Sequence, residues 1–188
     1  MDIRIFTDGN LLPHGAALRS VYIDAFCTPP WNEGEEKADG FAVRLTSNVR
    51  RPGFTAAVAF DGRRVVGFAT AWTTPTPFPS DRCYPQAAAG LGHGRAVDWL
   101  CGALEIDELA VRNSARGTGT AGTLLRTVTE GAPGGRAWLL TSVRSSRAMA
   151  FYRRERWTQA THPSPEGHGT VVFLGPSHPA GSLAAPPL

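Results

Sequence analysis

A glycine-rich turn between an apolar run and an amphipathic segment is the feature of this sequence with the clearest chemistry. Residues 103–111 are mostly apolar and predict a strand, and residues 117–130 predict a helix because Leu124, Leu125 and Val128 recur at helical spacing. The turn between them consists of Arg116, Gly117, Thr118, Gly119, Thr120 and Ala121. Glycine brings the backbone close to a ligand, and the first N–H groups of a helix have no partner within it. We therefore predict a phosphate or pyrophosphate site at this helix start.

Of two other phosphate-binding patterns, the turn fits one in part and does not fit the other. Gly117 to Gly122 also reads as G-x-G-x-x-G, which expects an acidic residue about 20 positions further on. Residues 136–144 contain no acid, although Arg144 would suit a 2′-phosphate, so NADP stays open. Too little chain follows for the rest of a doubly wound domain. The Walker pattern is excluded because the chain's only lysine is Lys37. A helix start with glycines for packing alone is the remaining interpretation.

Three carboxylates precede the turn on the predicted strand. Glu105 and Asp107 share one face of that strand, whereas Glu108 points to the other. Burial and mutual repulsion would raise the pKa of such a carboxyl and make it a better general base. Solvated or helix-capping acids are the alternative, and the sequence leaves open which face matters.

Two blocks of this sequence resemble the GCN5-related N-acetyltransferases, the GNAT superfamily. Val111, four residues and then Arg116-Gly-x-Gly-x-Ala121 is similar to the family's acetyl-CoA signature R-x-x-G-x-G/A. Ser145-x-x-Ala148-x-x-Phe151-Tyr152, followed by residues 153–157, resembles its N-x-x-A-x-x-F/L-Y-x-x-x-G-F block. The resemblance spans about residues 102–157.

The second block departs from the family pattern at three positions, with Ser145 for Asn, Arg156 for Gly and Trp157 for Phe. The serine removes one hydrogen bond expected to the cofactor arm. The loss of the glycine predicts a different exit from the helix, with the same aromatic plug after it.

The resemblance implies acetyl-CoA as co-substrate and direct attack by an amine, without a covalent enzyme intermediate. It implies a base on the strand, either Glu105 or Glu108. Tyr152 is implied as the general acid for the leaving thiolate, since a phenol lies within about 1.5 pKa units of an ordinary thiol. The implied cofactor-binding residues are Leu109, Ala110, Val111, Arg116, Gly117, Thr118, Gly119, Thr120, Ala121, Ser145, Ala148 and Tyr152.

In this family the acceptor pocket is shaped by the connection between the first two helices and by a later loop, here residues 26–36 and 73–100. Phe26, Trp31 and Glu33 are candidate substrate-binding residues, because an acid beside an aromatic face suits a compact cation. We predict a small-molecule primary amine as acceptor. The alternatives are a tryptophan that plugs the core beside an exposed helix start, and a non-catalytic acetyl-CoA-binding regulatory module.

The length of 188 residues predicts one domain. The resemblance implies the mixed α/β GNAT fold, a mostly antiparallel, twisted sheet flanked by helices over residues 1–175, and a flexible tail is expected at 176–188. A net charge of +3 with eighteen arginines indicates GC-rich bacterial coding rather than a nucleic-acid surface. Three scattered cysteines, no metal-ligand spacing and no long apolar run predict a cytoplasmic protein without metal or membrane attachment. A homodimer is left open.

Hydrophobic periodicity places the remaining elements. A strand is expected at 2–6, helices at 13–26 and through the following acidic segment to about 48, and a hairpin at 56–72 with its turn at Asp61-Gly62. Residues 73–100 are expected to be irregular, with an optional short helix at 95–101. A strand at 136–142, a helix at 146–156 and a strand at 170–174 complete the expectation.

Overall fold

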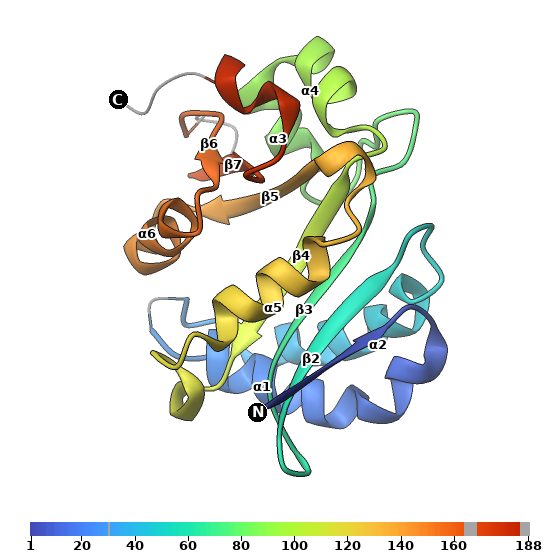
Figure 1. Ribbon diagram of the computed structural model, residues 1–188, viewed down its shortest axis with the longest axis vertical. Helices are drawn as coiled ribbons and strands as arrows, with labels where there is room; N and C mark the ends of the chain where they lie inside the picture. Colours follow the sequence, from blue (N-terminus) through green and yellow to red (C-terminus); the bar gives the residue numbers. More distant parts are fainter. Residues whose placement is uncertain (30, 164–168, 185–188) are drawn as a thin grey trace. The chain divides into compact units, whose positions relative to one another are not determined.

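Figure 1 shows the chain as a computed structural model, which describes residues 1–29, 31–163 and 169–184. Within this part of the chain, seven strands hydrogen-bond in the order β1-β2-β3-β4-β5-β7-β6. The chain forms two compact units, the first from Met1–Trp72 and Asp107–Glu130, the second from Thr73–Ile106 and Gly131–Leu188. The predicted fold class, a mixed and mostly antiparallel sheet flanked by helices, is confirmed.

The sheet of the first unit begins with an antiparallel meander. Strands β1 (Asp2–Phe6) and β2 (Thr55–Asp61) pair along their length, and β2 pairs with β3 (Arg64–Thr73). The predicted hairpin is confirmed: Asp61 pairs with Arg64, and Gly62 takes a φ of +58° in the turn between them. Glycine reaches this left-handed region without a Cβ penalty, which is why the turn can be so short.

Helices cover both faces of this meander. Helix α1 (Gly15–Phe26), which follows a short 3-10 helix at Gly9–His14, packs with α2 (Glu35–Asn48) on one face, while α5 (Thr120–Thr129) crosses the other (Figure 1). Two neighbouring residues of β3 show that its two faces pack against different helices. Phe68 is buried in the core under α1 and α2, whereas a Cβ on the preceding Gly67 would meet Leu124 of α5 at 3.0 Å.

The second unit pairs the start of β4 with the C-terminal strands. Strand β4 (Leu104–Val111) runs parallel to β5 (Ala137–Ser142). Strand β7 (Thr170–Leu174) lies antiparallel between β5 and the short β6 (Thr158–Gln159). Helix α6 (Ser146–Arg154) packs against β5 and β6, and Trp138 and Val172 lie in a separate apolar cluster formed with α3 and α4.

The expectation that residues 73–100 are irregular is wrong for most of this segment. It contains α3 (Tyr84–Leu91), which was not expected, and α4 (His93–Leu100), which corresponds to the optional short helix at 95–101. Pro85 sits in the first turn of α3, where its missing N–H costs nothing, and Gly92 separates the helices at a φ of +81°. Pro85 and Gly92 therefore mark helix boundaries, while residues 74–83 are irregular as expected.

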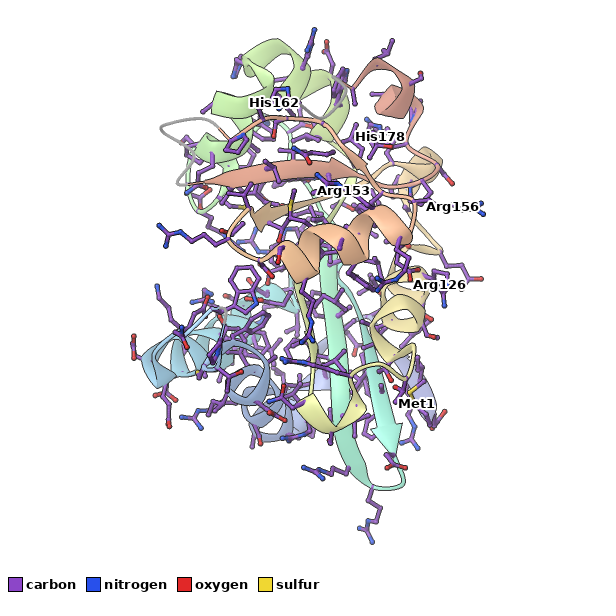
Figure 2. The ribbon with its side chains drawn as sticks, turned by 90° about the vertical axis from the view of Figure 1, so that its left-hand side faces the viewer. Met1, Arg126, Arg153, Arg156, His162 and His178 are labelled. Carbon is purple, nitrogen blue, oxygen red and sulfur yellow. The ribbon has the colours of Figure 1, made fainter. Side chains whose placement is uncertain are left out.

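The C-terminal segment also differs from the expected flexible tail. A 3-10 helix spans Pro179–Leu183, and Ala180 is buried in the apolar cluster of the second unit. His178, buried beside this helix (Figure 2), accepts a hydrogen bond from the Ala180 N–H at Nδ1. Its Nε2 must then carry the proton and donate to the Trp99 carbonyl at 3.0 Å. Residues 185–188 of the predicted tail lie outside the described residues. None of the described helices is long and apolar enough to cross a membrane.

Thr70 allows a test of how much an unpaired buried hydroxyl destabilises the core. Its hydroxyl is buried without a hydrogen-bond partner, so Thr70→Val should raise the free energy of unfolding by about 1 kcal/mol. Thr74→Val is the matched control, because the equally buried Thr74 hydroxyl accepts from Trp138 Nε1 at 2.7 Å. Thr74→Val should lower the free energy of unfolding by about 1–3 kcal/mol. Urea unfolding measures both; destabilisation by Thr70→Val would show that its hydroxyl is paired.

His178 should make stability pH-dependent. Burial, the largest influence, lowers the pKa of its imidazole below the ordinary value. The unfolded chain therefore binds a proton more readily, and stability should fall as the pH drops below about 6.5. Protonation would also place a donor at Nδ1 against the Ala180 N–H. The free energy of unfolding, measured from pH 7.5 to 5.5, should fall less steeply in His178→Gln than in wild type. An equally steep fall in both would show that other groups cause it.

Candidate active site

The glycine turn predicted to bind phosphate ends at the N-terminus of α5. Gly117 and Gly119 have φ values of +79° and +82°, and Gly119 is the N-cap residue of the helix. A Cβ at either position would meet no atom within 4 Å. Packing therefore does not require glycine here, whereas the left-handed backbone does. The first turn of α5 also lacks acidic side chains, so its N–H groups and positive dipole end favour an anion.

Two threonine hydroxyls brace the turn from within. Thr118 Oγ1 donates to the Ala115 carbonyl at 2.7 Å and lies 2.7 Å from Thr120 Oγ1. Thr120 is buried, and its hydroxyl also lies 3.1 Å from the Met1 sulfur; Figure 2 labels Met1. Since these hydroxyls are engaged by the protein, the backbone N–H groups are the principal donors that the turn offers to a ligand.

Polar side chains tie the segment before this turn to the last turns of α1. Arg112 donates to Ser20 Oγ and to the Val65 carbonyl, both at 2.9 Å. Asn113 Nδ2 donates to the Asp24 carboxylate at 2.7 Å. The predicted cofactor residue Arg116 donates to the Ala25 carbonyl at 3.3 Å. The glycine turn is therefore held on the same scaffold as the C-terminus of α1.

The predicted acceptor residues gather where α1 ends. Phe26 and Trp31 meet edge to face with ring centroids 6.0 Å apart, and the Glu33 N–H donates to the Phe26 carbonyl at 3.0 Å. Tyr22 joins them: its ring lies 4.6 Å from that of Phe26, and its hydroxyl donates to Glu33 at 2.7 Å. The structure thus brings Phe26, Trp31 and Glu33 together around Tyr22, which lies in the predicted helix 13–26 and was not among the candidate site residues.

The negative charge of Glu108 acts on the Tyr22 hydroxyl, which is part of this aromatic group. Burial raises the pKa of Tyr22 most, followed by the negative charge of Glu108 and the hydrogen bond to Glu33; Arg44 acts in the opposite sense. The phenol therefore remains a proton donor across the neutral range. Two carboxylates and one guanidinium act on a single buried hydroxyl, and the first unit supplies all of them.

Glu105 has a different environment, in the second unit. It is only 2% exposed and accepts a hydrogen bond from the buried Tyr84 hydroxyl. The Cys83 thiol lies 3.7 Å from its other carboxylate oxygen. Tyr84 and Cys83 come from α3 and its N-cap, an element that the sequence did not predict. The sequence left two carboxylates as candidates for the base. Glu105 is enclosed by this helix, whereas the charge of Glu108 acts on Tyr22 beside the candidate acceptor residues.

The second motif forms the N-cap and the body of α6. Ser145 is 2% exposed, and its hydroxyl accepts from the Ala148 N–H at 3.3 Å. Serine is a favoured N-cap residue, so the departure from asparagine retains a capped helix. Tyr152 is partly buried, with its ring 5.6 Å from Phe173 and 6.2 Å from Trp157. These ring contacts restrict the direction of the Tyr152 hydroxyl.

The exit of α6 corrects one expectation. Arg156 was expected to change the exit because the family has glycine there, but it takes a φ of +64° itself. Its N–H bonds to the Arg153 carbonyl, and the Trp157 N–H bonds to the Tyr152 carbonyl. These two bonds form a Schellman motif, completed by the contact of the Trp157 and Tyr152 rings. Arginine thus keeps the backbone of a glycine cap, with its exposed side chain directed outward (Figure 2).

Comparison with models of protein families shows which family the chain belongs to. Residues 17–156 match the model of the acetyltransferase (GNAT) family, which covers more than half of the chain. The protein belongs to this family of acetyltransferases. A search of curated protein sequences finds no match.

Solved structures share the fold at low sequence identity. PaiA N-acetyltransferase from Thermoplasma acidophilum, solved with coenzyme A, is 13% identical with a TM-score of 0.58, covering 93% of this chain and 99% of its own. The ribosomal-protein-S18-alanine N-acetyltransferase of Escherichia coli is 14% identical with a TM-score of 0.55, covering 94% of each chain. Aminoglycoside 6'-acetyltransferase type Ii is 17% identical with a TM-score of 0.59, covering 93% of this chain and 96% of its own. At such identities these similarities establish the fold alone.

Proposed function

We propose that the protein transfers an acetyl group from acetyl-CoA to a primary amine of a small molecule. The observation that carries this proposal is the turn at the start of α5, where two glycines with positive φ present backbone N–H groups to an anion. Membership of the acetyltransferase family supports the pyrophosphate of acetyl-CoA as that anion. We retain a cytoplasmic, non-nucleic-acid enzyme as the working assumption.

The residues of the turn fit this co-substrate. Pyrophosphate needs several N–H donors and close approach of the backbone, and left-handed glycines without neighbours above them allow both. We assign the pyrophosphate to residues 116–121 and the pantetheine arm to the backbone of residues 109–111. Ser145, Ala148 and Tyr152 are assigned by the family resemblance, although the Ser145 hydroxyl is already used to cap α6.

Acetyl-CoA supplies the acetyl group as an activated thioester. An alkylammonium of pKa about 10.4 is neutral in roughly one molecule in 10³ at pH 7, so the protein must accept a proton from it. Glu108 is our first candidate for this base, with Glu105 as the alternative. The neutral amine then attacks the acetyl carbonyl directly, forming a C–N bond as the C–S bond breaks. Tyr152 is proposed to protonate the leaving thiolate.

Gly119→Val should separate cofactor binding from stability. Valine in the left-handed conformation costs about 1–2 kcal/mol, and its Cβ branch would obstruct the approach of a pyrophosphate. The matched control is Gly62→Val, since Gly62 also has a positive φ and open surroundings. Calorimetric titration with acetyl-CoA should show a loss of more than about tenfold in affinity for Gly119→Val only. Equal affinities in both variants would remove the turn from the cofactor site.

The decisive experiment measures thiol release from acetyl-CoA with polyamines, aminoglycosides, amino acids and N-terminal peptides as acceptors. We expect turnover with small amines, and Tyr152→Phe should lower kcat by about 10- to 1000-fold while acetyl-CoA affinity is retained. The ring contacts of Tyr152 with Trp157 and Phe173 are retained in this variant.

The outcomes distinguish the alternatives. Turnover with peptides alone would overturn the small-molecule assignment and leave the acetyltransferase activity. Binding of acetyl-CoA without turnover of any amine would favour the regulatory module. Binding of NADPH in place of acetyl-CoA would overturn the cofactor assignment.

A further inference from the structure

Strand β1 forms an open edge of the sheet. In the described part of the chain it pairs only with β2, and it stands at one end of the strand order (Figure 1, dark blue). The pairing with β2 runs along the whole strand, from Asp2 opposite Phe60 to Phe6 opposite Ala56. Alternate N–H and C=O groups of β1 therefore point away from β2, where another strand can bond to them.

Exposed apolar side chains are concentrated near this edge. Six large apolar side chains are exposed in the described chain, and three of them, Met1, Ile5 and Leu12, come from its first twelve residues. Met1 and Ile5 occupy alternate positions that share one face of the strand, and they are 65% and 54% exposed. Leu12 belongs to the 3-10 helix Gly9–His14, which packs against β1. Apolar side chains beside an open strand edge favour association with another strand.

The charges of β1 are one acid and one base, two positions apart. Asp2 and Arg4 share the other face of the strand, where Arg4 Nε donates to the Asp2 carboxylate at 2.8 Å. The Arg4 guanidinium also lies 4.6 Å from the centre of the Phe60 ring, which holds it beside the strand. Both charged side chains are more than half exposed, so a second strand can reach them.

A second copy of β1 fits this edge in one register. Opposed side chains of antiparallel strands lie on the same face, so in a symmetric pair one residue must oppose its own counterpart. Centring the pair on Asp2 or on Arg4 sets like charges against each other, and centring it on Ile5 gives neither charge an opposite partner. Centring it on Ile3 sets Asp2 of each copy against Arg4 of the other, and Met1 against Ile5. Opposed side chains of opposite charge stabilise a sheet, whereas opposed like charges destabilise it.

We propose that the protein forms a homodimer through β1, with the two copies of the strand antiparallel and centred on Ile3. The sheets of the two copies then join across this edge. A five-residue strand and its exposed neighbours make a small interface, so the expected dissociation constant Kd is micromolar. The inference is independent of the proposed acetyltransferase activity and concerns a surface of the first unit alone.

Charge exchange tests the interface by sedimentation equilibrium, in which the mass should rise from one chain toward two over about 1–200 µM. Arg4→Asp opposes like charges and should raise Kd by about tenfold or more. The double variant Asp2→Arg with Arg4→Asp exchanges the two charges, so Kd should return to within about threefold of wild type. The matched control is Arg50→Asp, which makes the same charge change at an exposed position after α2 and should alter Kd by less than about twofold.

Disulfide trapping tests the register. Ile3→Cys places two cysteines opposite each other, whereas the cysteines of Ile5→Cys are four positions out of register and too far apart to bridge. Oxidation should therefore give a covalent dimer with Ile3→Cys only, although Ile5 is the more exposed position. Wild type, which carries Cys27, Cys83 and Cys101, sets the background. Because Ile3→Cys leaves both charges in place, trapping decides the question even where a charge variant fails to fold.

The mass of a single chain at every concentration would overturn the proposal. A dimer whose Kd is unchanged in Arg4→Asp would also overturn it, since the interface would then lie elsewhere. Failure of the double variant to recover, or trapping of Ile5→Cys in preference to Ile3→Cys, would overturn the register centred on Ile3. All of these outcomes leave the acetyltransferase proposal standing.

Discussion

The attachment of the last turns of α1 to the segment after β4 is the constraint on which the candidate site of the first unit depends. The loop that carries the candidate acceptor residues Trp31 and Glu33 leaves α1 at Phe26, and the glycine turn begins four residues beyond Arg112. Asn113 and Arg116 bond to Asp24 and the Ala25 carbonyl, which fixes both departures on one framework. Hydrogen bonds to charged groups contribute about 1.5–3 kcal/mol each, so several of them can hold the start of the glycine turn against the end of α1.

Burial gives the two strand glutamates different chemistry. Glu105 is enclosed and hydrogen-bonded to Tyr84, so substitution of either residue would remove a buried hydrogen bond to a charged group. Glu108 acts on Tyr22 together with Glu33, in the unit that also carries the candidate acceptor residues Phe26 and Trp31. The difference arises from what packs against each side of the strand, since the two residue types are identical.

The departures from the family's second motif show how substitution can leave geometry unchanged. Ser145 caps α6 where the family has asparagine, because a short side chain with an acceptor oxygen is all that the cap requires. Arg156 occupies a left-handed cap position at an energetic cost, and the Schellman bonds and the Trp157–Tyr152 contact offset it. The ring of Tyr152 is thereby kept in a defined place.

Local patterns in the sequence determined the hairpin at Asp61-Gly62, the strand, glycine turn and helix around Gly119, and the choice of family, because each depends on residues close together in the chain. Helix α3 was missed because its proline and glycine boundaries resemble those of a loop at short range, whereas α4 corresponds to the optional short helix expected at 95–101. Only the tertiary structure decided that Tyr22 meets Glu33, that Glu105 is enclosed by Tyr84 and that His178 bonds to Trp99. These pairings join residues that are 11 to 79 positions apart, and their energies depend on burial, which no local pattern specifies.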